Sequence, residues 1–334
     1  MKLRQFSLRS KRTIIIAIAL TTWILWLTLL GAKDAFFHLI NYWQIALTML
    51  FGSIIAGGTS IGGGAVAFPV FTKLLQISPH DAKIFSLAIQ SVGMTAASLT
   101  IYLAKIPVEW RVIRRASLGG ILGIFLGLKC FAPLLPPDLL KMSFTIMLTS
   151  FSITLFILNQ NKKHKKKSIF IWGKSEKIAC LFAGIIGGIM SGLVGNGIDI
   201  VLFSLMVLGW HLSEKVATPT SVILMALNAI FGLFCQVNIF HDFPITVQHY
   251  WFAAIPIVVI GAPLGTVLCS KLHRSTIANI LILLIFIELI SSLLIIPLRP
   301  AIIVSSILSM IIFSGINYWL YRLPYLKISQ SQIK

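Results

Sequence analysis

Long apolar runs separated by short polar segments dominate the chain. Runs near the length of a spanning helix lie at about residues 13–31, 82–104, 112–132, 139–158, 216–237, 248–268, 275–296 and 300–321. Each is long enough to cross the hydrocarbon core of a bilayer, about 30 Å thick, as an α-helix. A helix pairs its backbone polar groups within the segment, which lipid requires. We therefore predict an all-α, polytopic membrane protein.

Two further apolar stretches are interrupted by glycine and do not fit one helix. Residues 41–77 contain GGTSIGGGAVAFPV (57–70), and residues 178–209 contain SGLVGNGIDIVLF (191–203). The segment after the first break, 65–77, would be about 20 Å long as a helix, which is short of a full crossing. We predict that each stretch forms a hairpin that turns within the membrane.

The charges lie beside the apolar runs and set the predicted orientation. Lys and Arg number 28 against nine Asp and Glu, a net charge of +19, and they concentrate in segments such as 1–12 and 159–177. Lys and Arg mark cytoplasmic loops, so we predict a multi-pass protein of the cytoplasmic membrane with both termini in the cytoplasm and residues 238–247 outside. A nucleotide or lipid-headgroup site is the alternative for the basic segments. Nucleic-acid binding is not predicted.

The two hairpins begin corresponding halves of the chain. We predict an N-terminal segment with the first helix (1–40), repeat 1 (41–158), a basic loop (159–177), repeat 2 (178–296), and a last helix with its tail (297–334). Each repeat holds one hairpin and three spanning helices, an odd number, so the second copy is inverted. Matching positions are the glycine breaks, Pro107 with Pro244, and the close-packing pairs Gly123/Gly127 with Gly261/Gly265. Inverted repeats with broken helices are typical of secondary transporters, whose sites lie near the midplane.

The glycine breaks are the predicted substrate sites. A helix that starts within the membrane leaves its first N–H groups unpaired, and these donors with the helix dipole attract an anion. The predicted substrate-binding residues at the breaks are Gly62, Gly63, Gly64, Ala65, Gly195, Asn196 and Gly197. Ser91 and Thr95 share one helical face and are added to the site. Their hydroxyls could instead bond helices together.

Two intramembrane carboxylates are predicted to couple transport to an ion. Asp199 lies in the first turn after the second break, and Glu288 lies deep in the run 275–296. Buried carboxylates in membranes are costly and often functional, so we expect H⁺ as the coupling ion. A capping role for Asp199 and a neutral, hydrogen-bonded Glu288 are the alternatives. The partners expected are therefore a small anion, H⁺ and the lipid bilayer, and the sequence leaves open whether a homo-oligomer forms.

Common catalytic and nucleotide-binding motifs do not occur in the sequence. The chain shows no HExxH, GxSxG or Walker A pattern, so neither an enzyme nor a cofactor or metal is predicted. An intramembrane enzyme and a non-transporting scaffold are the competing classes.

Three motifs resemble one known family. GGGAVAFPV (62–70) looks like the GGGxxxxPxL signature of the TauE/SafE family of sulfite and organosulfonate exporters, and GGILGIFLG…LLP (119–136) and GAPLGTVL (261–268) resemble its second motif. The resemblance covers roughly residues 44–296. The second hairpin departs from it, with GNGID and with Leu202 in place of a proline. The resemblance implies a permease for sulfur-containing anions such as sulfite or sulfonates, without a cofactor.

Overall fold

The fold is a bundle of helices. The structure, a computed structural model, describes residues 8–59, 70–160, 172–297 and 299–322, and within these ranges every regular element is helical. The eight apolar runs form α1 (Leu8–Leu30), α5 (Pro79–Leu103), α6 (Trp110–Leu126), α7 (Pro137–Gln160), α10 (Glu214–Phe234), α11 (Ile245–Lys271), α12 (Arg274–Ile295) and α13 (Pro300–Arg322). By length and composition, six helices of the described ranges could each cross a membrane. The prediction of an all-α, polytopic membrane protein is confirmed.

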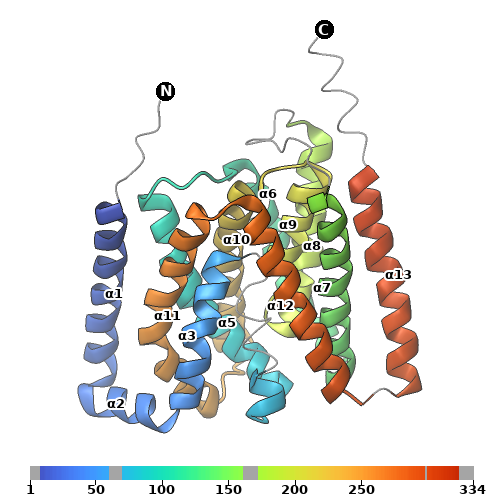
Figure 1. The fold of residues 1–334 in the computed structure, drawn as a ribbon. Coiled ribbons are helices and arrows are strands. Elements are labelled where there is room, and N and C mark those ends of the chain that lie inside the picture. Colours follow the sequence, from blue (N-terminus) through green and yellow to red (C-terminus); the bar gives the residue numbers. More distant parts are fainter. Residues whose placement is uncertain (1–7, 60–69, 161–171, 298, 323–334) are drawn as a thin grey trace.

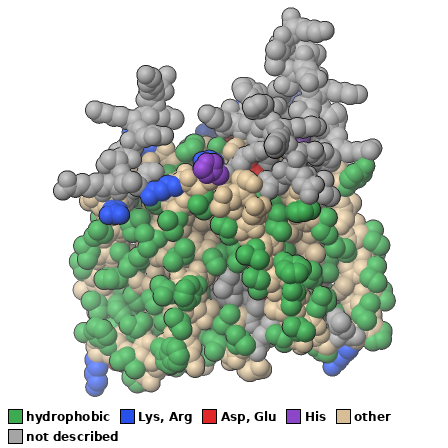
Figure 2. All heavy atoms as spheres, in the orientation of Figure 1, with side chains coloured by type: hydrophobic (Ala, Val, Ile, Leu, Met, Phe, Trp, Pro, Cys, Tyr) green, Lys and Arg blue, Asp and Glu red, His purple; other side chains and the backbone are tan. Residues whose placement is uncertain are grey.

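The helices run side by side between two faces of the bundle. α1 begins and α13 ends at one face, here called the terminal face, and α2 (Ala32–Asn41) lies across the opposite face, here called the α2 face (Figure 1). α2 meets α3 (Trp43–Gly58) at a bend of 82°. Hydrophobic side chains cover the middle of the visible side, whereas Lys and Arg gather toward the two faces (Figure 2). This arrangement fits an apolar belt in contact with lipid.

The second hairpin has the predicted glycine break. α8 (Lys174–Val194), about 31 Å long at the usual rise, ends at Gly195. Gly195 (φ 83°) and Gly197 (φ 155°) adopt backbone angles that side chains with a Cβ rarely take. α9 (Ile198–Ser204) then continues into a π-helical turn, η3 (Leu205–Gly209), and returns only part of the way. In the first hairpin the structure describes α3 and the π-helical turn η1 (Val70–Leu74), while Gly62–Ala65 lie outside the described residues.

Each hairpin packs on a helix of the other half through direct backbone contact. α3 lies along α11, and α8 lies along α6. A Cβ added at Gly57 of α3 would lie 1.9 Å from the carbonyl oxygen of Ala262, and one added at Gly123 of α6 would lie 2.1 Å from that of Ile185. A Cβ added at Gly265 would lie 1.9 Å from Ile54 O, one at Gly127 2.5 Å from Ile189 O, and one at Gly261 1.9 Å from the Ser53 hydroxyl. The predicted role of these small residues in close helix packing is confirmed.

Turns at matching positions of the two halves share one geometry. Gln76 and His211 both have a φ of 54°, after η1 and η3 respectively. The amide of the next residue reaches back in both turns, Ile77 N to Phe71 O and Leu212 N to Met206 O, each at 2.9 Å. Lys105 (φ 52°) and His241 (φ 50°) form a second such pair, following α5 and the π-helical turn η4 (Cys235–Ile239). These pairs support the predicted repeats, whose boundaries stay a prediction.

Candidate functional site

The second glycine break is held by side chains of α5. The backbone carbonyl of Gly195 accepts hydrogen bonds from Gln90 Nε2 at 3.0 Å and from Ser86 Oγ at 3.1 Å. Gln90 Nε2 also lies 2.5 Å from Ser86 Oγ, and its side chain is buried. The break leaves the carbonyl of Gly195 without a partner inside its helix. Two side chains from the other half of the chain therefore supply its hydrogen bonds.

The first amides after this break are also engaged. The amide of Gly197 donates to Asn196 Oδ1 at 2.9 Å, and the amide of Ile198 donates to Ser191 Oγ at 3.1 Å. Gly195 N closes α8 on Ser191 O at 2.8 Å. The structure thus gives Asn196 and Gly197 a role in shaping the turn. Their predicted role in binding substrate, and that of Gly195, stays a prediction.

Asp199 is buried beside this turn. It is 0% exposed, and neither carboxylate oxygen has a hydrogen-bond partner of good geometry among the described residues. The amides of Gly197, Asp199 and Ile200 and the side chain of Asn196 surround it with favourable dipoles. Asp199 is the second residue of α9, and the N-cap position itself is occupied by Gly197. The capping role and the proton-binding role of Asp199 both stay predictions.

A buried amide lies against the same helix start. Asn228 of α10 is 4% exposed, and neither atom of its side-chain amide has a partner among the described residues. A Cβ added at Gly120 would lie 2.5 Å from Ile198 Cδ1 and 2.8 Å from Asn228 Oδ1, which places Asn228 next to α9. Asp199 and Asn228 thus offer unsatisfied polar groups at the second break.

Two unsatisfied hydroxyls lie on or beside α3, the helix that precedes the first break. Ser53 of α3 and Thr218 of α10 are each 1% exposed, and neither hydroxyl has a partner within the described ranges. Thr218 lines a cavity of about 10 Å³ together with Gly57, whose carbonyl accepts a hydrogen bond from Thr266 Oγ1 at 2.9 Å. Gly62, Gly63, Gly64 and Ala65 themselves fall outside the described residues.

A second cavity lies between the flanks of the first break and the α5 residues that hold the second. It measures about 20 Å³, enough for roughly one water molecule, and its lining includes Ser53 and Phe71 on one side and Ser86 and Gln90 on the other. Described residues on either side of the first break and the α5 residues that contact the second break therefore line one cavity.

Lys83 is a residue of this region that sequence reasoning missed. It is 7% exposed, and its carbonyl oxygen would lie 2.8 Å from a Cβ added at Gly195. Asp242, from the loop between η4 and α11, interacts electrostatically with its ammonium group. The only sequence feature that could have pointed to Lys83 is its position near the start of the apolar run that forms α5, one turn inside the helix. A buried cation on the turn of α5 whose backbone contacts Gly195 could attract an anion.

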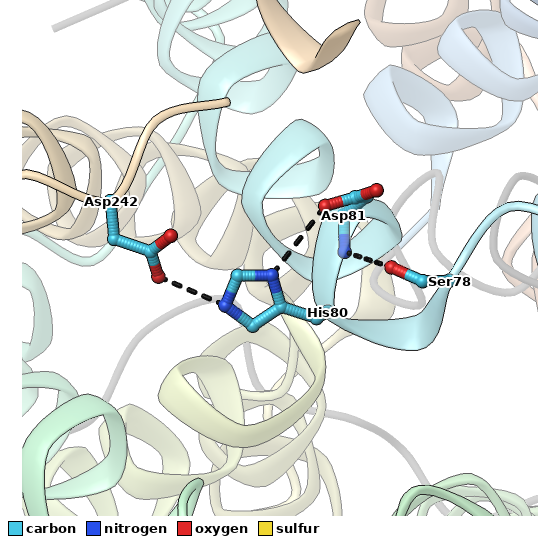
Figure 3. A network of polar contacts seen from close by, with 4 residues as sticks. All are labelled: Ser78, His80, Asp81 and Asp242. Carbon is cyan, nitrogen blue, oxygen red and sulfur yellow. Dashed lines mark hydrogen bonds and ion pairs between the residues drawn. The ribbon is translucent and has the colours of Figure 1, made fainter. Parts of the chain in front are cut away.

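A polar network at the α2 face ties the start of α5 to the loop that holds Asp242 (Figure 3). His80 Nε2 lies 2.9 Å from Asp242 Oδ2, and His80 Nδ1 lies 3.5 Å from Asp81 Oδ1. Ser78 caps α5 by accepting a hydrogen bond from the amide of Asp81 at 3.0 Å. This network lies between the polar residues beside Gly195 and the α2 face.

The remaining predicted site residues lie apart from the cavity. The half-buried hydroxyls of Ser91 and Thr95 donate to carbonyls of their own helix, those of Ala88 and Ser91. Glu288, 3% exposed, accepts a hydrogen bond from Thr145 Oγ1 of α7 at 3.2 Å, which joins α12 to α7, and another from Ser292 Oγ of its own helix at 3.1 Å. Their roles in transport stay predictions. Within the described ranges, no group of three or more His, Cys, Asp or Glu side chains is arranged to hold a metal ion.

Comparison with known proteins supports the interpretation of the sequence motifs. No curated protein and no solved structure shows a significant match to the chain. The sequence profile of the family described as sulfite exporter TauE/SafE matches residues 45–292. This range covers nearly all of the first hairpin, α5–α7, the second hairpin, α10, α11 and most of α12. This confirms the resemblance that the motifs at 62–70, 119–136 and 261–268 predicted. The chain belongs to the sulfite exporter TauE/SafE family.

Proposed function

We propose that this protein is a secondary transporter that moves a small anion, sulfite or another sulfur-containing oxyanion or sulfonate, across the cytoplasmic membrane. Membership of an exporter family supports transport and this class of substrate. The observation that carries the site is the set of buried, unsatisfied polar groups beside the two helix breaks: Ser53, Asp199, Thr218 and Asn228. Buried polar atoms are normally paired, so a substrate or a proton is the expected missing partner.

The substrate is proposed to bind at the first break. Backbone amides from Gly62 to Ala65 would donate to the anion, as at other helix starts, and the hydroxyls of Ser53 and Thr218 would add neutral donors. Lys83 would raise the local anion concentration from its place next to the cavity-lining residue Ala82. This arrangement holds an anion without an adjacent fixed carboxylate.

Asp199 is proposed to bind the coupling proton at the second break. Its carboxylate is unsuited to bind an anion directly, and the nearby amides of Gly197 and Ile198 are already engaged. A proton on Asp199 would be released when the site opens to the more alkaline side, which links anion movement to the pH gradient. Ser86 and Gln90 of α5, here called the α5 clamp, bind the carbonyl of Gly195 and also line the cavity next to the proposed substrate site.

Flux measurements in vesicles test the proposal. Purified protein in vesicles with an imposed pH gradient should transport one or more of sulfite, thiosulfate, sulfate, taurine and sulfoacetate. Lys83→Gln should lower the flux by about tenfold or more, the effect of removing one favourable charge interaction worth about 1.4 kcal/mol. Lys33→Gln, which removes an exposed cation of α2, should leave the flux unchanged. Absence of flux for all five anions, or normal flux by Lys83→Gln, would contradict the corresponding part of the proposal.

A further inference from the structure

A basic pocket lies between α6 and α8, at the opposite end of α8 from Gly195. It measures about 560 Å³ and is lined by Arg111, Arg114, Arg115 and Leu118 of α6 together with Trp172 and Lys177. We call it the basic pocket. Its volume is in the range of sites that hold small ligands. It sits at the first turns of two helices that are in backbone contact further along, at Gly119 and Gly123.

Most of the positive charge in the basic pocket is uncompensated. Arg111 is held by Glu109, with Nε 2.7 Å from Oε1 and Nη2 3.0 Å from Oε2, and its guanidinium lies 5.3 Å from the ring centre of Trp172. Arg114, Arg115 and Lys177 make no ion pair with a carboxylate in the part of the chain that the structure describes. Arg114 and Arg115 are exposed, and Lys177 is half-buried. Three cations therefore remain available to an anionic ligand.

An apolar surface continues from the basic pocket along both helices. On α6, Leu118 and Leu122 are 54% and 57% exposed, and on α8, Ile178 and Phe182 are 54% and 59% exposed. Each pair is spaced four residues apart and so lies on one helical face. The surface descends from the charged first turns toward the apolar belt of the bundle. A ligand that contacts both parts has a negatively charged head and an apolar body.

We propose that the basic pocket binds the headgroup of an anionic phospholipid, with the acyl chains along the exposed faces of α6 and α8. Basic pockets between helices near a membrane surface bind such headgroups, and Trp172 has the position of an interfacial aromatic residue. A soluble phosphate could bind the same cations. It would make no contact with the exposed apolar side chains of Leu118 and Leu122, whereas an acyl chain would. The continuity of charge and apolar surface favours the lipid.

Lipid binding to the purified, full-length protein tests the proposal. Native mass spectrometry and melting temperature would be measured with added phosphatidylglycerol, phosphatidylcholine, inorganic phosphate or glycerol phosphate. The pocket variant is Arg114→Gln/Arg115→Gln/Lys177→Gln. The control Lys33→Gln/Lys129→Gln/Lys271→Gln removes three exposed cations that lie outside the pocket. Size-exclusion profiles and helical content would check that both variants fold.

The wild type and the control should retain phosphatidylglycerol and melt at a higher temperature with it than with phosphatidylcholine. The pocket variant should bind phosphatidylglycerol on the order of a hundredfold more weakly, because each basic residue near an anionic surface contributes about a factor of five. Equal binding by the pocket variant and the control would overturn the proposal. An equal response to inorganic phosphate or glycerol phosphate would assign the pocket to a soluble anion and would also overturn it. Each of these results is independent of whether the protein transports sulfite.

Discussion

The side-chain amide of Gln90 donates a hydrogen bond to the backbone carbonyl of Gly195 at 3.0 Å, across 105 positions of sequence. Gln90 belongs to the first half of the chain, whereas Gly195 ends the first arm of the second hairpin. The left-handed turn at Gly195 (φ 83°) therefore has its side-chain partner on a helix of the other half of the chain. A shift of α5 would change the environment of the break.

Gln90→Leu should destabilise the protein by about 1–3 kcal/mol, because the buried carbonyl of Gly195 would lose one of its two side-chain donors. We also expect a lower transport rate, since the break would no longer be held against α5. Ser98→Ala is the matched control, because the Ser98 hydroxyl bonds only to Met94 O of its own helix among the described contacts. Thermal unfolding and vesicle flux measure the two effects. Unchanged stability in Gln90→Leu would show that the clamp is weak.

Glycine substitutions should separate backbone contacts from open positions. Gly57→Ala and Gly123→Ala place a Cβ about 2 Å from a backbone carbonyl oxygen, so each should destabilise by about 1–3 kcal/mol through overpacking. Gly52→Ala meets only the Met49 side chain at 3.8 Å, and Gly315→Ala meets nothing within 4 Å. These two controls should be neutral or gain up to about 1 kcal/mol from helix propensity. Equal melting temperatures for all four variants would exclude the close helix contacts described here.

Asp199→Asn should preserve anion exchange and abolish the response to an imposed pH gradient. The amide keeps the shape of the side chain but cannot bind and release a proton. Because Gly197, and not Asp199, occupies the N-cap position of α9, Asp199→Ala should not show the loss of about 0.5–2 kcal/mol that removal of an N-cap causes. Flux with and without a pH gradient and thermal unfolding of both variants provide the measurements. Gradient-driven transport by the Asn variant would rule out the coupling role.

Asp242→Asn should impair transport more than His80→Gln. The carboxylate of Asp242 interacts with Lys83 as well as with His80. The His80–Asp242 pair is 50% and 37% exposed in its side chains, so its coupling energy should stay below about 1 kcal/mol. A double-mutant cycle on thermal stability measures that coupling, and flux measurements compare the single variants. A larger transport defect in His80→Gln would contradict the assignment to Lys83.

The orientation in the membrane can be tested with single cysteines. In a variant without Cys130, Cys180, Cys235 and Cys269, a cysteine at Asn238 should react with an impermeant reagent added to intact cells. A cysteine at Lys163 or at Lys174 should react only after the membrane is opened, because the basic segment 159–177 is predicted to be cytoplasmic. External labelling at Lys163 would contradict the inverted arrangement of the repeats.

The helices of the fold were predictable because lipid imposes a simple rule on their composition. Each long apolar run became a helix, and the break at Gly195–Gly197 was marked by residues that tolerate φ > 0. The small-residue spacing of Gly123 and Gly127 also indicated close packing. Each of these features is contained in a short stretch of sequence, so helices, breaks and close-packing positions can be predicted without knowledge of tertiary contacts.

The contacts between the halves could not be predicted in the same way. Which residue of α5 faces Gly195 depends on the rotation of α5 and on a partner more than 100 residues away. Ser91 and Thr95 fitted a polar face, but Ser86 and Gln90 make the contact. Lys83 was not among the predicted site residues, and the structure buries it. The first break itself, Gly62–Ala65, stays a prediction.

The pairing of α3 with α11 has a consequence for biosynthesis. Gly57 contacts Ala262, which is synthesised about 200 residues later. Gly123 contacts Ile185, which is synthesised only about 60 residues later. At a synthesis rate of about 5–20 residues per second, the first hairpin emerges roughly 10–40 s before the helix that covers it. During that interval its closest backbone contact, with α11, cannot yet exist. A ribosome stalled before residue 245 should therefore leave α3 without its backbone contact to α11.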